Sequence, residues 1–284
     1  MSTSGQSLDS GLYPVATPIG NLRDITLRAL DILKEVDAIA CEDTRVTKRL
    51  LAHYGIDRPL VAYHEHNAAR RRPALLGRLA KGERIALVSD AGTPVLSDPG
   101  RTLVDEACEQ GIAVFAVPGP SALTAALSVA GLACDRVLYL GFLPSKPAAR
   151  RRAIADLAGI EASLVLFEAP HRVAASLKDL AAELGPRQAA LCRELSKRFE
   201  EVRRAPLDEL AAQIAHRPVK GEIVLVIAPP LAGKAATPQE QVDAALRDAL
   251  DSLSVKEAAT AVAWITGASR RELYQRALQL KDEG

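Results

Sequence analysis

Short apolar runs alternate with amphipathic segments along the first 120 residues. Apolar runs of strand length, three of them leading into glycine or proline, cover residues 12–16, 38–40, 84–89 and 113–117. Apolar positions with the 3.6-residue period of a helix follow the first run, at Leu27, Leu30, Ile32, Leu33 and Val36. A second helix is predicted over residues 45–53, closed by Gly55. Strands and helices that alternate in this way predict a largely parallel, doubly wound sheet.

A second set of strands and helices follows residue 120. Strand-like runs lie at residues 136–140, 163–167, 189–191 and 222–228. Helices fit between them at residues 148–157, 173–184 and 206–216. Because some connections are too short for a parallel crossover, we expect mixed strand directions in this second α/β domain.

The last 50 residues read as a linker and a small helical unit. Residues 228–238 are rich in proline, alanine and glycine, which is typical of a linker. Beyond them, Ser254 with Glu257 and Ser269 with Glu272 have capping-box spacing, and Gly267 between them predicts a helix end. Two short helices about such a turn resemble a helix-turn-helix unit. Three parts are therefore predicted, at residues 11–120, 121–230 and 238–284.

Composition narrows the classes of protein. Of the 284 residues, 48% are hydrophobic and 25% are charged, which excludes a disordered or fibrous chain. The net charge is +1, so any nucleic-acid site is a local basic patch and not a positive charge spread over the whole protein. Aromatic residues are only 4%, which argues against a single-strand binder that stacks bases on aromatic side chains. The first ten residues lack a signal-peptide pattern, and no apolar run has the length of a membrane span. Four scattered cysteines predict free, buried thiols in a reducing cytoplasm.

Three predicted strands run into loops of the same design. The loops contain glycine and proline and precede helices, at residues 17–21, 89–100 and 118–122. In open parallel sheets, ligands bind at the carboxyl ends of strands, where backbone N–H groups and helix N-termini face them. Such turns also connect strands to helices in proteins without a ligand there. The loops carry neither a P-loop nor a dinucleotide-binding motif, which favours a ligand without a pyrophosphate.

Clusters of polar residues follow several strands. They span residues 42–45, 64–67, 168–172 and 193–198. Carboxylates and imidazoles are the usual proton acceptors in catalysis, and His64, Glu65 and His66 also have a spacing that a metal can use, although a surface hydrogen-bonding role fits them better. Basic runs at residues 70–72, 146–152 and 193–204 are either solvated helix faces or parts of a surface that faces an anion.

Taken together, these segments resemble a known family. The motifs are Tyr-Pro-Val-Ala-Thr-Pro-Ile-Gly-Asn (13–21), Cys-Glu-Asp-Thr-Arg (41–45), Tyr-His-Glu-His-Asn (63–67), Ser-Asp-Ala-Gly-Thr-Pro (89–94), Ser-Asp-Pro-Gly (97–100), Pro-Gly-Pro-Ser (118–121), Gly-Phe-Leu-Pro (141–144), Glu-Ala-Pro-His-Arg (168–172) and Arg-Glu-Leu-Ser (193–196). They are similar to those of the RsmI family of 16S ribosomal RNA ribose 2′-O-methyltransferases, within the tetrapyrrole-methylase superfamily. The resemblance covers residues 12–227 and, more loosely, the helical tail.

The resemblance implies a fold, a cofactor and a substrate. It implies two α/β domains of the tetrapyrrole-methylase type with S-adenosylmethionine in the cleft between them, and methylation of a cytidine ribose in 16S RNA at the decoding centre of the small subunit. Cofactor-binding residues would be Thr17, Pro18, Gly20, Asp90, Ala91, Gly92, Pro94, Val95, Ser121, Ala122, Gly221 and Glu222. Motif matching places Asp43, His64, Glu65 and Glu168 in the cleft, and because carboxylates and imidazoles are the usual proton acceptors, these four are the candidates for the base. Arg45, Arg172 and Arg193 would hold phosphates or order the cleft. Further candidates for RNA contact, from the basic runs and the tail, are Arg151, Arg152, Arg270 and Arg271. No metal is expected.

Two other functions stay open from the sequence. One is a sister methyltransferase that acts on a tetrapyrrole or a protein side chain, and the other is a nucleotide-sensing module without catalysis. The superfamily resemblance further implies a homodimer. The role of the helical tail, RNA contact or packing, is not decided by its charge, because acidic residues outnumber basic ones there.

Overall fold

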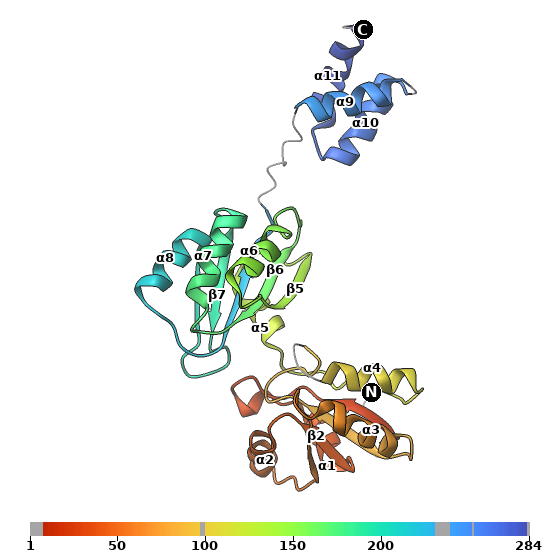
Figure 1. Ribbon diagram of the computed structural model, residues 1–284, viewed down its shortest axis with the longest axis vertical. Helices are drawn as coiled ribbons and strands as arrows, with labels where there is room; N and C mark the ends of the chain where they lie inside the picture. Colours follow the sequence, from red (N-terminus) through yellow and green to blue (C-terminus); the bar gives the residue numbers. More distant parts are fainter. Residues whose placement is uncertain (1–7, 97–99, 231–238, 252, 283–284) are drawn as a thin grey trace. The chain divides into compact units, whose positions relative to one another are not determined.

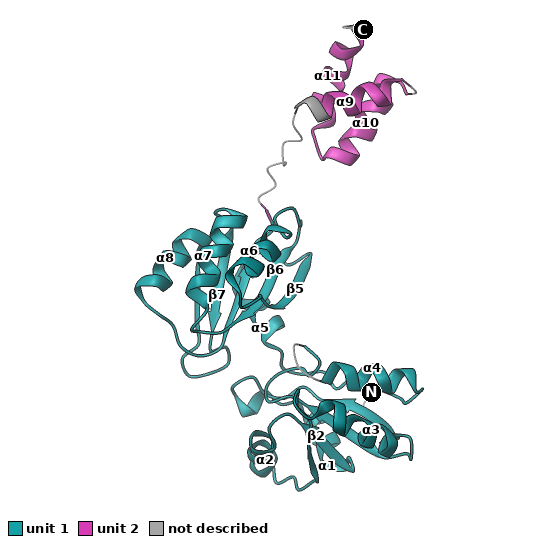
Figure 2. Ribbon diagram, viewed as in Figure 1, with its two compact units in different colours: residues 1–229 teal, residues 230–284 magenta. Residues whose placement is uncertain are grey.

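The computed structural model describes residues 8–96, 100–230, 239–251 and 253–282. The first seven residues, positions 97–99 of the Ser-Asp-Pro-Gly motif and most of the predicted linker, residues 231–238, lie outside the described residues. The chain divides into two compact units, Met1–Pro229 and Pro230–Gly284 (Figure 2).

The first sheet of the larger unit, which contains the strand labelled β2 in Figure 1, is wholly parallel. Its strands are β1 (Gly11–Pro14), β2 (Ala38–Cys41), β3 (Leu60–Ala62) and β4 (Arg84–Val88), in the spatial order β1-β4-β2-β3. Its helices are α1 (Leu27–Glu35), α2 (Thr44–His53), α3 (Ala68–Leu79) and α4 (Gly100–Glu109), with a short η1 (Leu22–Asp24) before α1. The prediction of a parallel, doubly wound sheet is therefore confirmed.

Alternate residues of these strands face two different cores. Ile39, Cys41 and Ala86 pack with apolar residues of α1 and α2. Ala40 and Leu87 pack with residues of α3 and α4 on the other face. This is the period-two alternation of a strand that is buried on both sides, and it explains why the strands are almost continuously apolar.

One prediction about this sheet was wrong, and one strand was not predicted. Residues 113–117 form no strand of their own but only single bridges, Leu12 with Val114 and Val15 with Val117. Strand β3 was not predicted, because its three residues are only half buried and lie at the sheet edge, where the apolar pattern is weak.

The second sheet has mixed directions, as predicted. Its strands are β5 (Val137–Phe142), β6 (Ser163–Glu168), β7 (Gln188–Arg193), β8 (Glu201–Pro206) and β9 (Ile223–Ile227), in the order β5-β6-β9-β7-β8. Only β5 and β6 pair in parallel, and every other neighbouring pair is antiparallel. Strand β8 was not predicted, because its sequence Glu-Val-Arg-Arg-Ala-Pro is largely polar and lies at the sheet edge.

Helices cover both faces of this second sheet. The helices α6 (Pro147–Ala155), α7 (Val173–Leu184) and α8 (Leu207–His216) share a core with Leu164, Leu166 and Leu225. On the opposite face, α5 (Ala122–Ala130) packs through Ala126 and Ala130 against Val165 and its neighbours. The division of residues 11–230 into two domains at 120 stays a prediction.

The smaller unit is a bundle of three helices, α9 (Gln239–Leu250), α10 (Val255–Thr266) and α11 (Arg270–Asp282). The predicted capping box is present at α10, with Ser254 and Glu257 bonded reciprocally, and Gly267 ends the helix in a left-handed conformation. Leu246, Val262, Leu273 and Ala277 form its core. The two predicted helices are confirmed, and α9 is a third that the sequence analysis did not separate.

Two of the four cysteines are not where the sequence predicted. All four are free, but Cys108 and Cys134 are exposed while Cys41 and Cys192 are buried. Burial raises the pKa of the Cys192 thiol to about 11. In the described part of the chain, no helix is long and apolar enough to cross a membrane.

Candidate functional site

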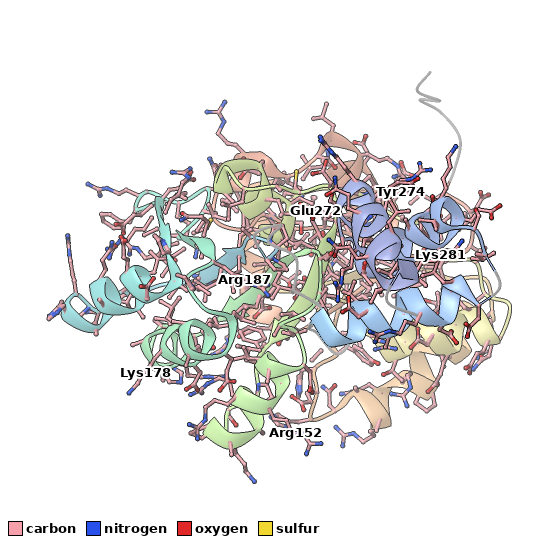
Figure 3. The ribbon with its side chains drawn as sticks, turned by 90° about the horizontal axis from the view of Figure 1, so that it is seen from above. Arg152, Lys178, Arg187, Glu272, Tyr274 and Lys281 are labelled. Carbon is pink, nitrogen blue, oxygen red and sulfur yellow. The ribbon has the colours of Figure 1, made fainter. Side chains whose placement is uncertain are left out.

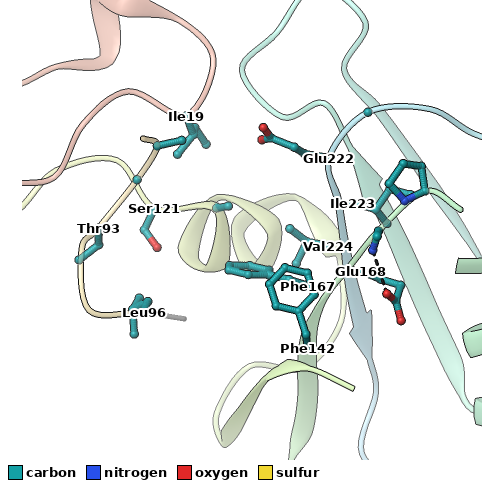
Figure 4. Close-up of a pocket in the computed structure, with 16 residues that line it drawn as sticks. Ile19, Thr93, Leu96, Ser121, Phe142, Phe167, Glu168, Glu222, Ile223 and Val224 are labelled. Atoms are coloured by element: carbon teal, nitrogen blue, oxygen red, sulfur yellow. Dashed lines mark hydrogen bonds between the residues drawn. The ribbon is translucent and has the colours of Figure 1, made fainter. Parts of the chain in front are cut away.

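The main pocket of the larger unit encloses about 400 Å³ and is drawn in Figure 4. Loops that follow strands of both sheets line it. Its lining residues are Ile19, Ala91, Gly92, Thr93, Leu96, Ser121, Ala122, Phe142, Phe167, Glu168, Ala169, Pro170, Gly221, Glu222, Ile223 and Val224. A mostly apolar hollow with a few polar groups is typical of a site for a small organic ligand.

Two strand-end loops of the first sheet are joined to make one wall of this pocket. Thr17 and Gly92 exchange backbone hydrogen bonds of 2.9 and 3.0 Å, and the Thr17 hydroxyl donates to the Ser89 carbonyl at 3.1 Å. Gly92 has a φ of +79°, and a Cβ there would lie 3.3 Å from Ile19 Cγ2. The position therefore favours glycine both for its backbone conformation and for the close approach of Ile19.

Aromatic residues of the second sheet form another wall. The register of β5 against β6 shifts between Tyr139 and Gly141, so a bulge lies just before Phe142. A bulge redirects the side chains that follow it. Phe142 is 53% exposed, and its ring centroid lies 5.9 Å from that of Phe167. The pocket thus has two aromatic rings beside its mouth.

A network of partly exposed charges supports the third side. Lys197 Nζ lies 3.0 Å from Glu194 Oε1 and 3.2 Å from Glu222 Oε2, and Glu194 also accepts from the Glu222 N–H at 2.9 Å. Gly221 has a φ of +92°, and a Cβ there would collide with the Glu194 carboxylate, so the position favours glycine. The hydrogen bond from the Glu222 N–H and the nearby Lys197 lower the pKa of Glu194. The network holds the Gly221–Glu222 loop at the pocket rim.

Glu168 lies at the pocket, but its carboxylate is engaged elsewhere. The side chain is 0% exposed and accepts from the Ala169 N–H at 2.8 Å, a bond dashed in Figure 4. It also accepts from the Ser176 hydroxyl and lies 3.2 Å from Arg172 Nε. These partners occupy both oxygens, so the carboxylate fastens the end of β6 to the start of α7.

Asp43 caps helix α2 instead of facing the main pocket. Its carboxylate accepts from the Arg45 N–H at 2.8 Å and pairs with the Arg45 guanidinium at 2.6 Å. Hydrogen bonds from the Arg45 side chain and backbone lower the pKa of Asp43 to about 2. A carboxylate of such low basicity is a poor proton acceptor near neutral pH.

His64 and Glu65 follow β3 at the edge of the first sheet and do not line the main pocket. Asn67 Oδ1 accepts from the His64 N–H at 3.0 Å, which orients the Asn67 amide so that its Nδ2 donates to His64 Nε2 at 3.0 Å. The imidazole lone pair is therefore occupied. Glu65 is exposed.

Comparison with known proteins identifies the fold and its relatives. Residues 11–211 match the family described as Tetrapyrrole (Corrin/Porphyrin) Methylases, and residues 236–281 match the RsmI C-terminal HTH domain. The chain belongs to the tetrapyrrole methylases. Within them it is 48% identical over 277 residues to a protein of Mesorhizobium japonicum named ribosomal RNA small subunit methyltransferase I, which covers 97% of this chain and 94% of that protein. A protein of the same name from Escherichia coli O157:H7 is 44% identical, with 96% and 98% covered.

Solved tetrapyrrole methylases share the fold at low sequence identity. A cobalt precorrin-4 methyltransferase superposes with a TM-score of 0.59 at 15% identity, covering 76% of this chain and 94% of that one. The uroporphyrin-III C-methyltransferase of Thermus thermophilus, solved with S-adenosylhomocysteine, gives 0.56 at 21% identity, covering 77% and 97%. The predicted fold class is thereby confirmed.

The residues predicted for the cofactor of this methylase fold separate into three groups. Ala91, Gly92, Ser121, Ala122, Gly221 and Glu222 line the main pocket. Gly20 packs against the Lys197 side chain, and Pro94 and Val95 lie outside the lining, with Val95 in a strained left-handed backbone conformation at φ +80°. Thr17, Pro18 and Asp90 line a different pocket, beside α2.

The predicted RNA-binding arginines also divide. Arg172 donates to the Leu143 carbonyl at 2.6 Å, and Arg193 pairs with Glu201 at 3.1 Å and donates to the Lys220 carbonyl, so both are built into the methylase fold. The exposed ones are Arg45, whose side chain is 88% exposed, Arg151 and Arg152 on α6, and Arg270 and Arg271 on α11. Arg152 is labelled in Figure 3.

Sequence reasoning missed the apolar lining and the Lys197 network. Ile19, Phe142, Ala169 and Pro170 sit inside motifs that the sequence analysis had singled out, next to residues chosen for their polarity. An apolar residue that contacts a ligand cannot be distinguished by its type from any other apolar residue. These lining residues could therefore have been predicted only from their position next to the polar residues of those motifs. Among the described residues, no group of three or more His, Cys, Asp or Glu side chains is arranged to hold a metal ion.

Proposed function

We propose that this chain transfers the methyl group of S-adenosylmethionine to the ribose 2′-oxygen of a cytidine in the 16S RNA of the small ribosomal subunit, at the decoding centre. The observation that carries the proposal is the 48% identity over 97% of the chain to a protein named ribosomal RNA small subunit methyltransferase I. The tetrapyrrole-methylating relatives share only 15–22% of their residues with it, which makes a tetrapyrrole the weaker candidate substrate.

The main pocket suits this cofactor chemically. S-adenosylmethionine contains no phosphate, and the pocket loops contain no phosphate-binding motif. The backbone and side chains of Ala91, Ser121 and Glu222 supply polar groups for the nucleoside and the amino acid part. Phe142 and Phe167 place aromatic rings where a sulfonium cation is attracted to the ring quadrupole.

When bound, S-adenosylmethionine would supply a methyl group that its sulfonium makes electrophilic. The ribose 2′-oxygen would bond to that carbon as the carbon–sulfur bond breaks, which leaves S-adenosylhomocysteine and releases the ribose proton. The residues of this chain contribute mainly alignment, an effect that is worth several kcal/mol in well-oriented reactions. The Thr17–Gly92 link and the Lys197 network keep opposite sides of the pocket in place for it.

Among the four candidate bases we propose Glu65 as the proton acceptor, because it is exposed and makes no hydrogen bond or ion pair in the described part of the chain; it lines neither pocket, so it would have to meet the ribose outside their walls. Asp43 is held by Arg45, Glu168 is buried in its own hydrogen bonds, and His64 would first have to release Asn67. We expect Glu65→Gln to reduce kcat about 100-fold or more, as loss of a general base does, and to leave cofactor affinity unchanged. Unchanged kcat in Glu65→Gln would overturn this assignment.

We propose that exposed arginines contact RNA phosphates. We also propose that the protein is a cytoplasmic homodimer. Arg151, Arg152, Arg270 and Arg271 are the exposed candidates without a described ion pair, whereas the exposed guanidinium of Arg45 would have to share Asp43 with an external anion. Light scattering of the purified protein tests the dimer.

Incubation of the purified chain with labelled S-adenosylmethionine and small subunits from cells that lack the enzyme tests the activity. We expect one labelled ribose methyl on a cytidine of 16S RNA by mass mapping. Label on a tetrapyrrole control or on a ribosomal protein, with none on RNA, would reject the proposal.

A further inference from the structure

A second pocket lies beside helix α2, next to the main pocket. It encloses about 300 Å³ and is lined by Thr17, Pro18, Leu22, Val46, Thr47, Arg49, Leu50, Ser89 and Asp90. We call it the α2 pocket. Its wall continues into that of the main pocket, because Thr17 and Pro18 precede Ile19 and Ser89 and Asp90 precede Ala91 along the same two loops. These loops are tied together by the Thr17–Gly92 bonds.

Most polar groups of the α2 pocket already have partners. The Thr17 hydroxyl donates to the Ser89 carbonyl, and the Ser89 hydroxyl donates to the Ala91 carbonyl at 3.2 Å. One Asp90 oxygen, Oδ1, accepts from the Asp43 N–H at 3.0 Å. In the described part of the chain, the other Asp90 oxygen and the exposed Arg49 guanidinium make no hydrogen bond or ion pair. The pocket therefore offers one acceptor and one cation, with Pro18, Val46 and Leu50 as apolar walls.

This set of groups fits a cytidine nucleotide. A carboxylate accepts a hydrogen bond from the exocyclic amine of cytosine, whereas uracil presents a carbonyl oxygen at the same position and is repelled. Apolar walls suit the faces of a planar base, and an arginine at the rim suits a phosphate. We propose that the α2 pocket holds the base of the target cytidine, extruded from the RNA, with Asp90 reading its amine and Arg49 binding a flanking phosphate.

The inference deepens the proposed function and rests on it. It gives Asp90 a role in substrate selection instead of the cofactor binding that the sequence suggested. The two pockets share the loops at residues 17–19 and 89–91, so the ribose of a base in the α2 pocket has to lie along these loops to meet a methyl donor in the main pocket. Selection of cytidine would then come from this chain and not only from the position of the nucleotide in the ribosome.

Asp90→Asn provides the test. Asparagine keeps a carbonyl oxygen for the Asp43 N–H and turns its NH₂ group, a donor, toward the base. Small subunits are assembled with either cytidine or uridine at the methylated position, and kcat/KM is measured for each. We expect the wild-type chain to prefer cytidine, and Asp90→Asn to lose at least about 10-fold on cytidine while its preference moves toward uridine. Affinity for S-adenosylmethionine should not change.

Matched variants isolate the role of the pocket. Asp57→Asn removes an exposed carboxylate outside it and should leave both values unchanged. Arg49→Gln should raise KM for both subunits and leave the cytidine-to-uridine ratio unchanged. Val46→Phe should fill the pocket and raise KM without weakening cofactor binding, which keeps the test available if Asp90→Asn does not fold.

Calorimetric titration with cytidine or uridine 5′-monophosphate provides a readout that needs no methyl transfer. The wild-type chain should bind the cytidine nucleotide more tightly, Asp90→Asn should reverse the order, and Val46→Phe should bind neither. An unchanged preference in Asp90→Asn, in catalysis or in binding, overturns this inference. Absence of any methyl transfer by the wild-type chain would instead reject the proposed function, and the titration would still decide what the α2 pocket binds.

Discussion

The ion pair between Glu168 and Arg172 connects the end of β6 to the start of α7 beneath the main pocket. The carboxylate is fully buried, and the Arg172 guanidinium also donates a hydrogen bond to the carbonyl of Leu143, which directly follows β5. A buried charge that loses its partner is costly because it cannot recover its hydration. The pair therefore stabilises the second sheet and fixes the backbone of Ala169 and Pro170 at the pocket.

Glu168→Gln separates this structural role from catalysis. We expect the free energy of unfolding to fall by about 2 kcal/mol, because Arg172 keeps a hydrogen-bonding neighbour but loses its counter-charge. Urea unfolding measures this change. Per folded molecule, kcat should remain within about threefold of wild type, whereas loss of a catalytic base reduces it by 10²-fold or more. Glu65→Gln, at an exposed position, is the control for stability.

At the scale of elements, an ion pair joins the starts of two neighbouring strands. Asp37, just before β2, accepts from the Arg84 N–H at 2.8 Å and from its guanidinium at 2.7 and 3.0 Å, where β4 begins. Hydrogen bonds from the Arg84 side chain and backbone lower the pKa of Asp37 to about 2. The parallel pairing of β2 with β4 is thus stabilised at its amino end, opposite the ligand loops.

The Asp37 pair predicts a pH dependence of stability. Because the pKa of Asp37 is lower in the folded chain than its ordinary value of 3.8, its contribution is present above about pH 4 and is lost as the pH falls toward 2. The difference in unfolding free energy between wild type and Asp37→Asn should therefore shrink over that range, as measured by urea unfolding at several pH values. Asp31→Asn, on the exposed side of α1, should show no such trend.

Helix α10 depends on its capping box. Ser254 accepts from the Glu257 N–H, and Glu257 accepts from the Ser254 N–H at 3.1 Å. We expect Ser254→Ala to destabilise the three-helix unit by about 1 kcal/mol, because backbone donors of the first turn lose their acceptor. Circular dichroism during thermal unfolding measures the loss. Thr260→Ala, within the same helix, should have little effect, and a loss as large there would contradict the assignment to the cap.

At the scale of the whole molecule, the chain consists of two units with separate cores. The three-helix unit has an internal ion pair, Arg276 with Asp243 at 2.5 Å, and its own apolar cluster around Leu246 and Leu273. Arg276 is therefore used inside the unit, while Arg270 and Arg271 remain exposed. Separate cores allow the two units to unfold in separate transitions.

Trp264 reports on the smaller unit alone, because it is the sole tryptophan of the chain and is 91% exposed on α10. Its emission in the native protein should be that of a hydrated indole and should shift little on unfolding. Acrylamide quenching measures its accessibility. A blue-shifted, poorly quenched emission would contradict an exposed position.

The same fluorophore tests RNA contact by the tail. If Arg270 and Arg271 bind phosphates, small subunits should change Trp264 emission, since α11 begins close after α10. The double variant Arg270→Gln/Arg271→Gln should bind subunits more weakly and with a smaller dependence on salt. Equal affinity and equal salt dependence in the variant would assign the tail to packing.

The sequence by itself determined the class of fold, the strand-end loops and the family. A strand that is covered on both faces consists almost entirely of apolar residues, as in residues 84–89, and can therefore be recognised in the sequence. The glycine and proline motifs are short, contiguous and specific, so they can be recognised as well. The edge strands β3 and β8 were not predicted, because their half-buried or polar residues do not form a continuous apolar run.

Only the tertiary structure decided which polar residues are free to act. Catalytic and binding sites often contain residues of the types of Asp43, Glu168 and Arg172. In the folded chain, however, each of these side chains already forms hydrogen bonds or an ion pair with other residues. It also separated Asp90 from Ala91, neighbours in the chain, into two pockets. The physical reason is that availability depends on desolvation and on partners distant in sequence, which no local pattern of residues records.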